Sequence, residues 1–275
     1  SKRSLEDGDA SEGPSFKRHG ARSHLLDVIK EAGLTKKAVV DDISDLTRLD
    51  NNDRVSLLRF IGQDVDKANR FRLLLETACT LHGSSFENSD LISSPSNNSF
   101  PVTDTEQLFV RETYQHLYNE IVLKFKDSPR NRTEKRVIVN GTAGIGKSAF
   151  LIYFIIRLLA TSSDDNPPLV IFQEKEGSMC YAYGGLTTIR YGFVEDFRPF
   201  LHLPETWYLV DSSPNPLLAD ARSIYSASPK TLKSDKRGYQ EIEKRVIWKY
   251  HMAPWREEEL EQCRESVERF NVVSE

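Results

Sequence analysis

The chain has 275 residues, 37 basic and 41 acidic side chains, a net charge of −4 and 39% hydrophobic residues. This is the composition of an ordinary globular protein, and the length suggests two units. The slightly negative charge excludes a general electrostatic attraction to nucleic acid, and no apolar run reaches the roughly 20 residues that span a bilayer. The three cysteines lie far apart, which argues against a disulfide framework or a metal cluster and predicts reduced thiols.

Residues 1–22 are polar, rich in Gly and Ser, and poor in large apolar residues, which predicts a disordered tail. The basic pairs Lys2-Arg3 and Lys17-Arg18 have the spacing of a bipartite nuclear import signal. A solvated tail with scattered charge explains them equally well.

Residues 23–83 carry apolar side chains three or four positions apart, which predicts a small bundle of about four helices. Gly33, Gly62 and Gly83 punctuate the pattern as helix stops. Residues 84–103 are dominated by Ser, Asn and Pro and predict a linker.

Residues 104–275 predict an α/β domain with a parallel sheet. An amphipathic helix is expected over 108–126 and another directly after residue 148. Short apolar runs bounded by polar or Pro-containing segments are typical of buried parallel strands, and strands separated by crossovers imply a sheet covered on both faces. The expected strands are 137–139, 169–173, 207–211, 223–227 and 245–252.

The stretch GTAGIGKS at 141–148 matches the phosphate-binding pattern G-x-x-x-x-G-K-[ST], with a strand before it and a helix after it. Glycines allow backbone conformations in which successive N–H groups point at phosphate oxygens, and the helix dipole adds to this. Lys147 would contact the β and γ phosphates and Ser148 would bind Mg²⁺. The predicted nucleotide-binding residues are Gly141, Gly144, Ile145, Gly146, Lys147, Ser148 and Ala149. The sequence therefore predicts a P-loop NTPase that uses ATP or another nucleoside triphosphate.

A carboxylate at the end of a neighbouring strand is needed to hold the metal, and Asp211 ends the strand 207–211. Many ATPases of this kind carry Glu at the next position, where this chain has Ser212. Glu174 and Glu176 follow the strand 169–173 and are alternative water-activating residues, although such loop carboxylates are usually only solvated. If neither glutamate activates water, hydrolysis is expected to be weak or absent. The predicted catalytic residues are Lys147, Asp211 and Glu174, and the predicted metal ligands are Ser148 and Asp211.

Further polar residues admit weaker interpretations. Arg190 and Arg222 are candidates for an arginine finger. Ser226 or Ser228 could lie near the γ phosphate, unless this is merely a serine-rich turn. The basic stretch 228–237 is the candidate contact for nucleic acid, and a solvated loop is its alternative.

Several separated segments resemble, in the same order, Crinkler effectors and the related retrotransposon hot spot proteins. The resemblance covers about residues 105–265, and its more specific part is HMAPWREEEL at 251–260. The segments are 110–121, 137–159, 207–211, 226–229 and 251–260. The resemblance implies a P-loop NTPase module in a secreted microbial protein that acts in the host nucleus, with Lys147, Ser148 and Asp211 in the phosphate and metal roles. A cytoplasmic location is the alternative.

The chain departs from the family at both ends. The family's ubiquitin-like header is not visible, and the helical region 23–83 stands in its place. The sequence stops at Glu275, before the usual lid region and nuclease-like domain, as expected of a fragment or of a member that kept only the nucleotide-binding core.

Three hypotheses about function follow. The first is an ATPase that depends on Mg²⁺. The second is a nucleotide-gated or catalytically vestigial module that binds a host protein through residues 23–83. The third, and least favoured, is a DNA-directed factor. None of the three involves a membrane.

Overall fold

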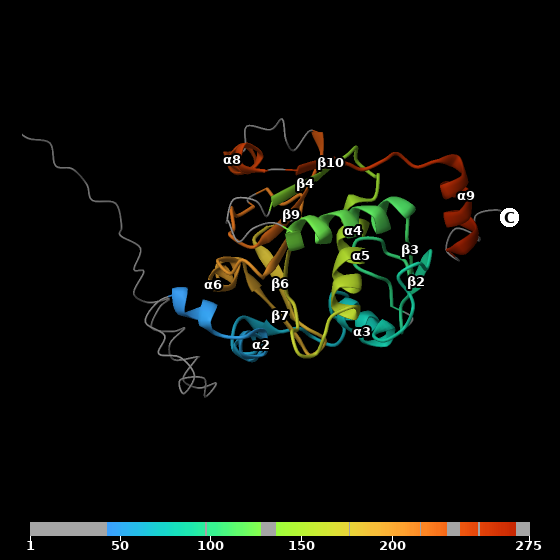
Figure 1. The fold of residues 1–275 in the computed structure, drawn as a ribbon. Coiled ribbons are helices and arrows are strands. Elements are labelled where there is room, and N and C mark those ends of the chain that lie inside the picture. The colour runs from blue at the N-terminus through green and yellow to red at the C-terminus, as the bar shows by residue number, and fades with distance from the viewer. Residues whose placement is uncertain are drawn as a thin grey trace, which may run out of the picture.

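The computed structural model describes residues 43–96, 98–127, 136–175, 177–214, 216–229, 237–246 and 248–267. The predicted tail 1–22 with its two basic pairs, and the first part of the predicted helical region, lie outside these residues. The described chain is mixed α/β and is built around an eight-stranded sheet with the order β1-β7-β6-β5-β8-β9-β4-β10 (Figure 1).

Five neighbouring strands of this sheet are parallel, in the order β5-β8-β9-β4-β10. They are β4 (Arg136–Asn140), β5 (Leu169–Gln173), β8 (Trp207–Asp211), β9 (Arg222–Ala227) and β10 (Trp248–His251). The predicted parallel sheet is confirmed, because each expected apolar run overlaps one of these strands and the strands pair in parallel. The carboxyl ends of β4, β9 and β8 meet at the same edge, with β9 between the other two.

The other three strands are antiparallel and were not predicted. They are β1 (Gln63–Asp64), β6 (Met179–Gly184) and β7 (Thr188–Phe193), and they extend the sheet beyond β5. Parallel neighbours need a crossover of about a dozen residues. Only residues 174–178 separate β5 from β6, and only 185–187 separate β6 from β7, so each pair forms a hairpin.

Helices cover both faces of the sheet, as predicted. Side chains alternate along each strand, so Val137 and Val139 of β4 join one core cluster while Ile138 joins the other. The first cluster contains α3 (Arg72–Leu81), α4 (Glu112–Asp127) and α5 (Lys147–Ala160). The second contains η2 (Ile43–Arg48), α2 (Asn51–Leu58), α6 (Arg198–Leu201) and α8 (Arg237–Arg245). Figure 1 shows α4 and α5 on one side of the strands and α6 on the other.

Helix α5 is apolar around almost its whole circumference, and its buried residues include Leu151, Ile152, Tyr153, Phe154 and Ile155. A helix of this kind must be covered on more than one side. The sheet covers one side, and α3 and α4 cover the rest through the same core cluster. The helix that begins at the glycine loop is therefore the most enclosed helix of the described fold.

The two described helices of the predicted bundle pack on other parts of the fold, α2 on the sheet and α3 mainly on α5. Helices α2 and α3 lie in different core clusters, and β1 pairs with the sheet edge. Each of these short helices has too little apolar surface to form a core alone, whereas the sheet faces offer a large one. Gly83 follows the end of α3 with φ +75°, as a helix stop should. Gly62, with φ +65°, instead turns the chain into β1.

The segment predicted as a linker, 84–103, also takes part in the core. It contains β2 (Leu91–Ser93), which pairs with β3 (Gln107–Phe109) in a separate two-stranded sheet. Phe86, Ile92 and Phe100 are buried in the same cluster as α4 and α5. The Ser and Asn residues that suggested a linker lie between these apolar side chains. The expected domain boundaries stay predictions.

The last described element is α9 (Glu257–Ser266), and an extended segment connects it to β10 (Figure 1). None of the helices within the described ranges is long and apolar enough to cross a membrane.

Candidate functional site

The glycine-rich loop 141–146 joins the carboxyl end of β4 to α5. Gly144 has φ +78° and Gly146 has φ +102°, a region that other residues enter only with strain. At Gly146 a Cβ would lie 2.1 Å from the Tyr114 hydroxyl oxygen, so glycine is also required by space. The backbone of this loop therefore depends on the glycines that the motif contains.

Lys147 is the first residue of α5, and its ammonium group lies inside the loop. Its Nζ donates hydrogen bonds to the carbonyl oxygens of Gly141 (2.7 Å) and Thr142 (2.8 Å). Burial lowers the pKa of Lys147, the Asp211 carboxylate opposes this shift, and the Lys175 charge adds to it. A partly desolvated cation held among loop carbonyls attracts an anion more strongly than a solvated one.

Ser148 and Asp211, the two predicted metal ligands, are brought together by the fold. The Ser148 hydroxyl donates to Asp211 Oδ1 at 2.7 Å. Ser226, which pairs with Asp211 across β8 and β9, donates to the same oxygen at 3.1 Å. Asp211 is 3% exposed. A carboxylate and two hydroxyls thus converge where the glycine loop enters α5, although the described residues contain no cluster of three or more His, Cys, Asp or Glu side chains suited to a metal.

Ser212, the residue after Asp211, turns back toward β9. Its φ is +49°, its N–H donates to the Ser226 carbonyl oxygen at 3.1 Å, and its hydroxyl lies 3.1 Å from the Ser226 hydroxyl. A non-glycine residue in this region is strained, and such strain clusters at functional sites. The position where many P-loop ATPases carry a glutamate is occupied here by a serine that is bonded to the neighbouring strand.

Glu174, the predicted water-activating residue, begins the turn between β5 and β6, where its N–H donates to the Met179 carbonyl oxygen. Its charge raises the pKa of Cys180 and Tyr181 on β6, an effect smaller than that of burial. Its catalytic role stays a prediction. Glu176 lies outside the described residues.

The two arginine-finger candidates lie away from the loop. Arg190, on β7, donates to the carbonyl oxygens of Ile61 (2.9 Å) and Gly62 (2.8 Å), and so holds the segment before β1. Arg222 is the first residue of β9, at the opposite end of that strand from Ser226. The finger role stays a prediction for both residues. Residues 230–236 of the basic stretch lie outside the described ranges.

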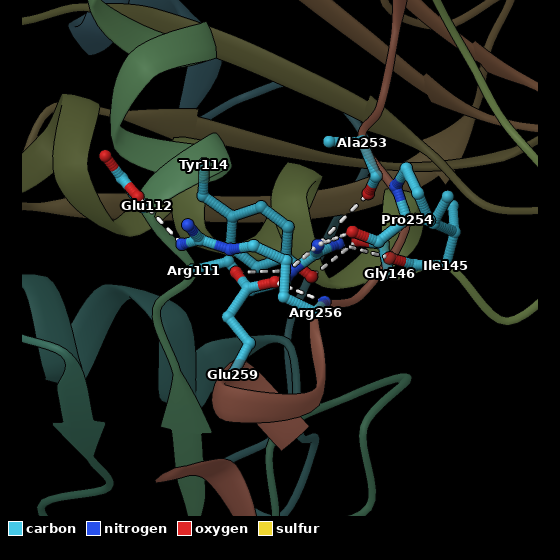
Figure 2. A network of polar contacts seen from close by, with 9 residues as sticks. All are labelled: Arg111, Glu112, Tyr114, Ile145, Gly146, Ala253, Pro254, Arg256 and Glu259. Atoms are coloured by element: carbon cyan, nitrogen blue, oxygen red, sulfur yellow. Dashed lines mark hydrogen bonds and ion pairs between the residues drawn. The ribbon is translucent and has the colours of Figure 1, made fainter. Parts of the chain in front are cut away.

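Arg111 contacts the glycine loop and was missed by the sequence analysis. It precedes α4 and is 1% exposed. Its Nη1 donates to the carbonyl oxygen of Ile145 at 2.9 Å. Its Nε and Nη2 donate to the two carboxylate oxygens of Glu259 on α9, at 3.1 and 2.9 Å (Figure 2). The available signal was a charged residue directly after the apolar run LFV at 108–110, where a buried charge needs a partner.

The same guanidinium also binds the segment after β10. Nη2 donates to the carbonyl oxygens of Ala253 (3.0 Å) and Pro254 (3.1 Å), and the group lies 4.2 Å from the centroid of the Trp255 ring. One arginine thus joins the start of α4, the glycine loop and the approach to α9 (Figure 2).

Two other groups complete this network. Burial raises the pKa of Tyr114, so its hydroxyl stays protonated and donates to the Gly146 carbonyl oxygen at 2.9 Å. Burial would raise the pKa of Glu259, but the hydrogen bonds from Arg111 and from the Arg256 N–H, together with their charges, hold it below its usual value. Glu259 is therefore an ionised partner of Arg111. A cavity of about 350 Å³ lies beside them, lined in part by His116 and Pro254.

Comparison with known proteins identifies distant relatives. No family model matches the chain. Crinkler effector proteins 15 and 16 of Phytophthora infestans are each 28% identical to it over 112 residues, or 41% of this chain. The match covers only 17% and 16% of their lengths. The similarity supports a Crinkler-like relation, as the sequence segments predicted.

Proposed function

We propose that this chain contains the P-loop NTPase module of a Crinkler-like effector, and that it binds ATP or another nucleoside triphosphate with Mg²⁺ at the glycine loop. The observation that carries the proposal is the 2.7 Å contact between the Ser148 hydroxyl and the Asp211 carboxylate. These residues come from parts of the sequence 63 positions apart, and they join the end of the glycine loop to the end of β8. A hydroxyl and a carboxylate are the hard oxygen ligands that Mg²⁺ prefers.

The loop and the first turn of α5 would hold the phosphates. The loop N–H groups and the helix dipole favour an anion, and Lys147 supplies the positive charge. In the structure Lys147 is bonded to two loop carbonyls. A bound phosphate would replace those carbonyls as its partner. The metal would neutralise charge that develops on the phosphates.

A second candidate function is binding without turnover, and Ser212 favours it. Its hydroxyl is bonded to Ser226 and cannot act as a general base at neutral pH. Glu174 is the residue to which turnover would then be assigned. Without such a base the nucleotide would act as a structural ligand that gates contact with a host protein.

The role as an effector inside host cells, after secretion, rests on the similarity to the two Phytophthora proteins. Entry into the nucleus would depend on the basic pairs in residues 1–22, and a cytoplasmic location is the alternative. Capture of a host protein by residues 23–83 alone stays a prediction, but α2 packs on the sheet and α3 packs mainly on α5, so an isolated fragment would lose the partners of both helices. An intact chain is therefore the right bait for partner searches.

The test is titration calorimetry with ATP and Mg²⁺, followed by phosphate release from the same samples. Lys147→Ala removes the loop cation, and Lys244→Ala removes an exposed cation of α8 as the matched control. Binding by the wild type and by the control, with loss in Lys147→Ala, is the expected result. Absence of binding in the wild type would overturn the proposal.

Phosphate release separates the two candidates. Release that depends on Lys147 and Glu174 supports an ATPase, whereas binding without release supports the gated module. In Asp211→Asn, which keeps the size of the side chain, nucleotide binding should lose its dependence on Mg²⁺.

A further inference from the structure

We propose that Arg111 is a positioning residue for the glycine loop, and that it makes the phosphate-binding shape of the loop depend on the docking of α9. The expected effect on ATP affinity rests on the proposed function, whereas the expected effect on the shape of the loop does not. The basis is a single buried guanidinium with partners on three segments of the chain (Figure 2).

The loop peptides beside Gly146 are held by two hydrogen bonds from the α4 side. Arg111 donates to the Ile145 carbonyl oxygen, and Tyr114 donates to the Gly146 carbonyl oxygen, both at 2.9 Å. In a trans peptide the C=O and the N–H point in opposite directions. Fixing the Ile145 carbonyl toward Arg111 therefore turns the Gly146 N–H the other way. The Gly146 carbonyl oxygen also accepts the Phe150 N–H at 2.9 Å, so α5 and Tyr114 together orient the Lys147 N–H. Successive N–H groups facing one side are what an anion site requires.

The two flanking glycines make this restraint necessary. Gly144 and Gly146 both have positive φ, and glycine has more accessible backbone conformations than any other residue. A loop with this freedom does not keep one orientation of the peptide between residues 145 and 146 by local preference. The bond from Arg111 selects that orientation.

The selection in turn depends on α9. Glu259 accepts hydrogen bonds from Arg111 Nε and Nη2 and also from the Arg256 N–H at 3.2 Å, which caps the start of α9. If α9 leaves, the buried guanidinium loses its carboxylate and keeps only carbonyl partners, because Ala253 and Pro254 precede α9 and follow Met252, whose N–H is bonded to Asn140 of β4. A buried charge without its partner is strongly unfavourable, so Arg111 would turn to solvent and release Ile145. Binding to the loop and docking of α9 are therefore linked, and linkage acts in both directions.

Two variants and one control test the inference. Arg111→Lys keeps the charge but loses the planar fork, which lysine cannot reproduce. Glu259→Gln keeps the size of the partner and removes its charge. Arg136→Lys is the control, because Arg136 is a buried arginine at the other end of β4 that donates to the Ala219 carbonyl oxygen (3.1 and 2.6 Å).

The first readout is hydrogen exchange of the 141–148 amides without nucleotide, measured by mass spectrometry. Faster exchange in this segment is expected for Arg111→Lys and Glu259→Gln, with β5 and β8 exchanging as in the wild type. The control should exchange normally in the loop even if it unfolds more easily. The second readout is the Kd for ATP with Mg²⁺, expected to weaken about ten-fold in both variants, within the usual range of coupling between sites, and to stay unchanged in the control.

The results that would overturn the inference are distinct from those that overturn nucleotide binding. If loop exchange in both variants equals that of the wild type, Arg111 does not position the loop, whatever the affinity. If exchange and affinity change in all three variants in proportion to lost stability, Arg111 is only structural. If the wild type binds no ATP, the proposed function fails, and the exchange experiment still decides the role of Arg111.

Discussion

Replacing Gly146 by alanine is expected to destabilise the fold through two separable effects. The first is the backbone, because φ is +102° and a left-handed conformation costs a residue with a Cβ about 1–2 kcal/mol. The second is the overlap of the new methyl group with the Tyr114 hydroxyl, 2.1 Å away, and overpacking of this kind costs about 1–3 kcal/mol. The free energy of unfolding should therefore fall by about 2–5 kcal/mol, the sum of these two ranges.

The two effects can be separated with Tyr114→Phe. Without the hydroxyl, the nearest atom to the methyl is the ring Cζ at 3.3 Å, which needs only a small shift. Tyr114→Phe itself loses the bond to the Gly146 carbonyl oxygen, a loss of about 1 kcal/mol. In the Tyr114→Phe background, Gly146→Ala should then cost only the backbone contribution, about 1–2 kcal/mol.

The assay is equilibrium unfolding in urea of the wild type, the two single variants and the double variant. The expected coupling is about 1–3 kcal/mol, with the double variant more stable than the two single losses predict. If the two losses add to within about 0.5 kcal/mol, Tyr114 does not limit the space at Gly146 and the reasoning is refuted.

Two further predictions concern titratable groups. Because the folded pKa of Glu259 lies below its usual 4.5, its ion pair with Arg111 contributes stability that is complete above the usual value and is lost as pH falls through the folded pKa. Urea unfolding from neutral pH to below 4.5 should thus show a smaller acid loss in Glu259→Gln than in the wild type, and equal losses would contradict the network. Burial raises the pKa of Cys79 and Cys180, which disfavours the reactive thiolate. With iodoacetamide at neutral pH, exposed Cys79 should react more slowly than an unfolded thiol, and buried Cys180 should not react until the chain unfolds. Mass spectrometry would measure the labelling of each cysteine. Rapid labelling of Cys180 in the folded chain would exclude its burial.

The segments that suggested a relation to Crinkler proteins are also neighbours in space. Arg111 comes from the segment 110–121, and Glu259 from 251–260. Between them lies the glycine loop of 137–159, held through Ile145. The hydrogen bonds among these three segments explain how residues so distant in sequence can contribute to one site. They also make α9 a candidate element for control of that site.

The parallel part of the fold was predictable because its signals are local. A buried parallel strand needs a continuous apolar run, and WYLVD at 207–211 is one whatever else the chain contains. The glycine loop is equally local, since the positive φ of Gly144 and Gly146 constrains the residues of the loop itself. The sequence therefore predicted Ser148 and Asp211 as partners from their positions after a loop and a strand.

What only the tertiary structure decided depends on contacts between distant residues. The short strand β1 exists because it pairs with β7, 126 residues further along at Asp64 and Arg190. A strand of two residues is too short to show an alternating pattern from which the pairing could be predicted. The helices before the loop show the same dependence, because an apolar face does not reveal whether it will cover another helix or a sheet.

Arg111 is the clearest case of this division. Its sequence neighbours predict only a charged residue before a helix, since Glu259 is 148 positions away and Ile145 is 34. The sequence by itself determined the glycine loop, the order of the parallel strands along the chain and the residues proposed to bind a phosphate and a metal. The tertiary structure alone decided which contacts hold that loop in shape, because the partners of a buried charge are residues distant in sequence that become neighbours only in the folded chain.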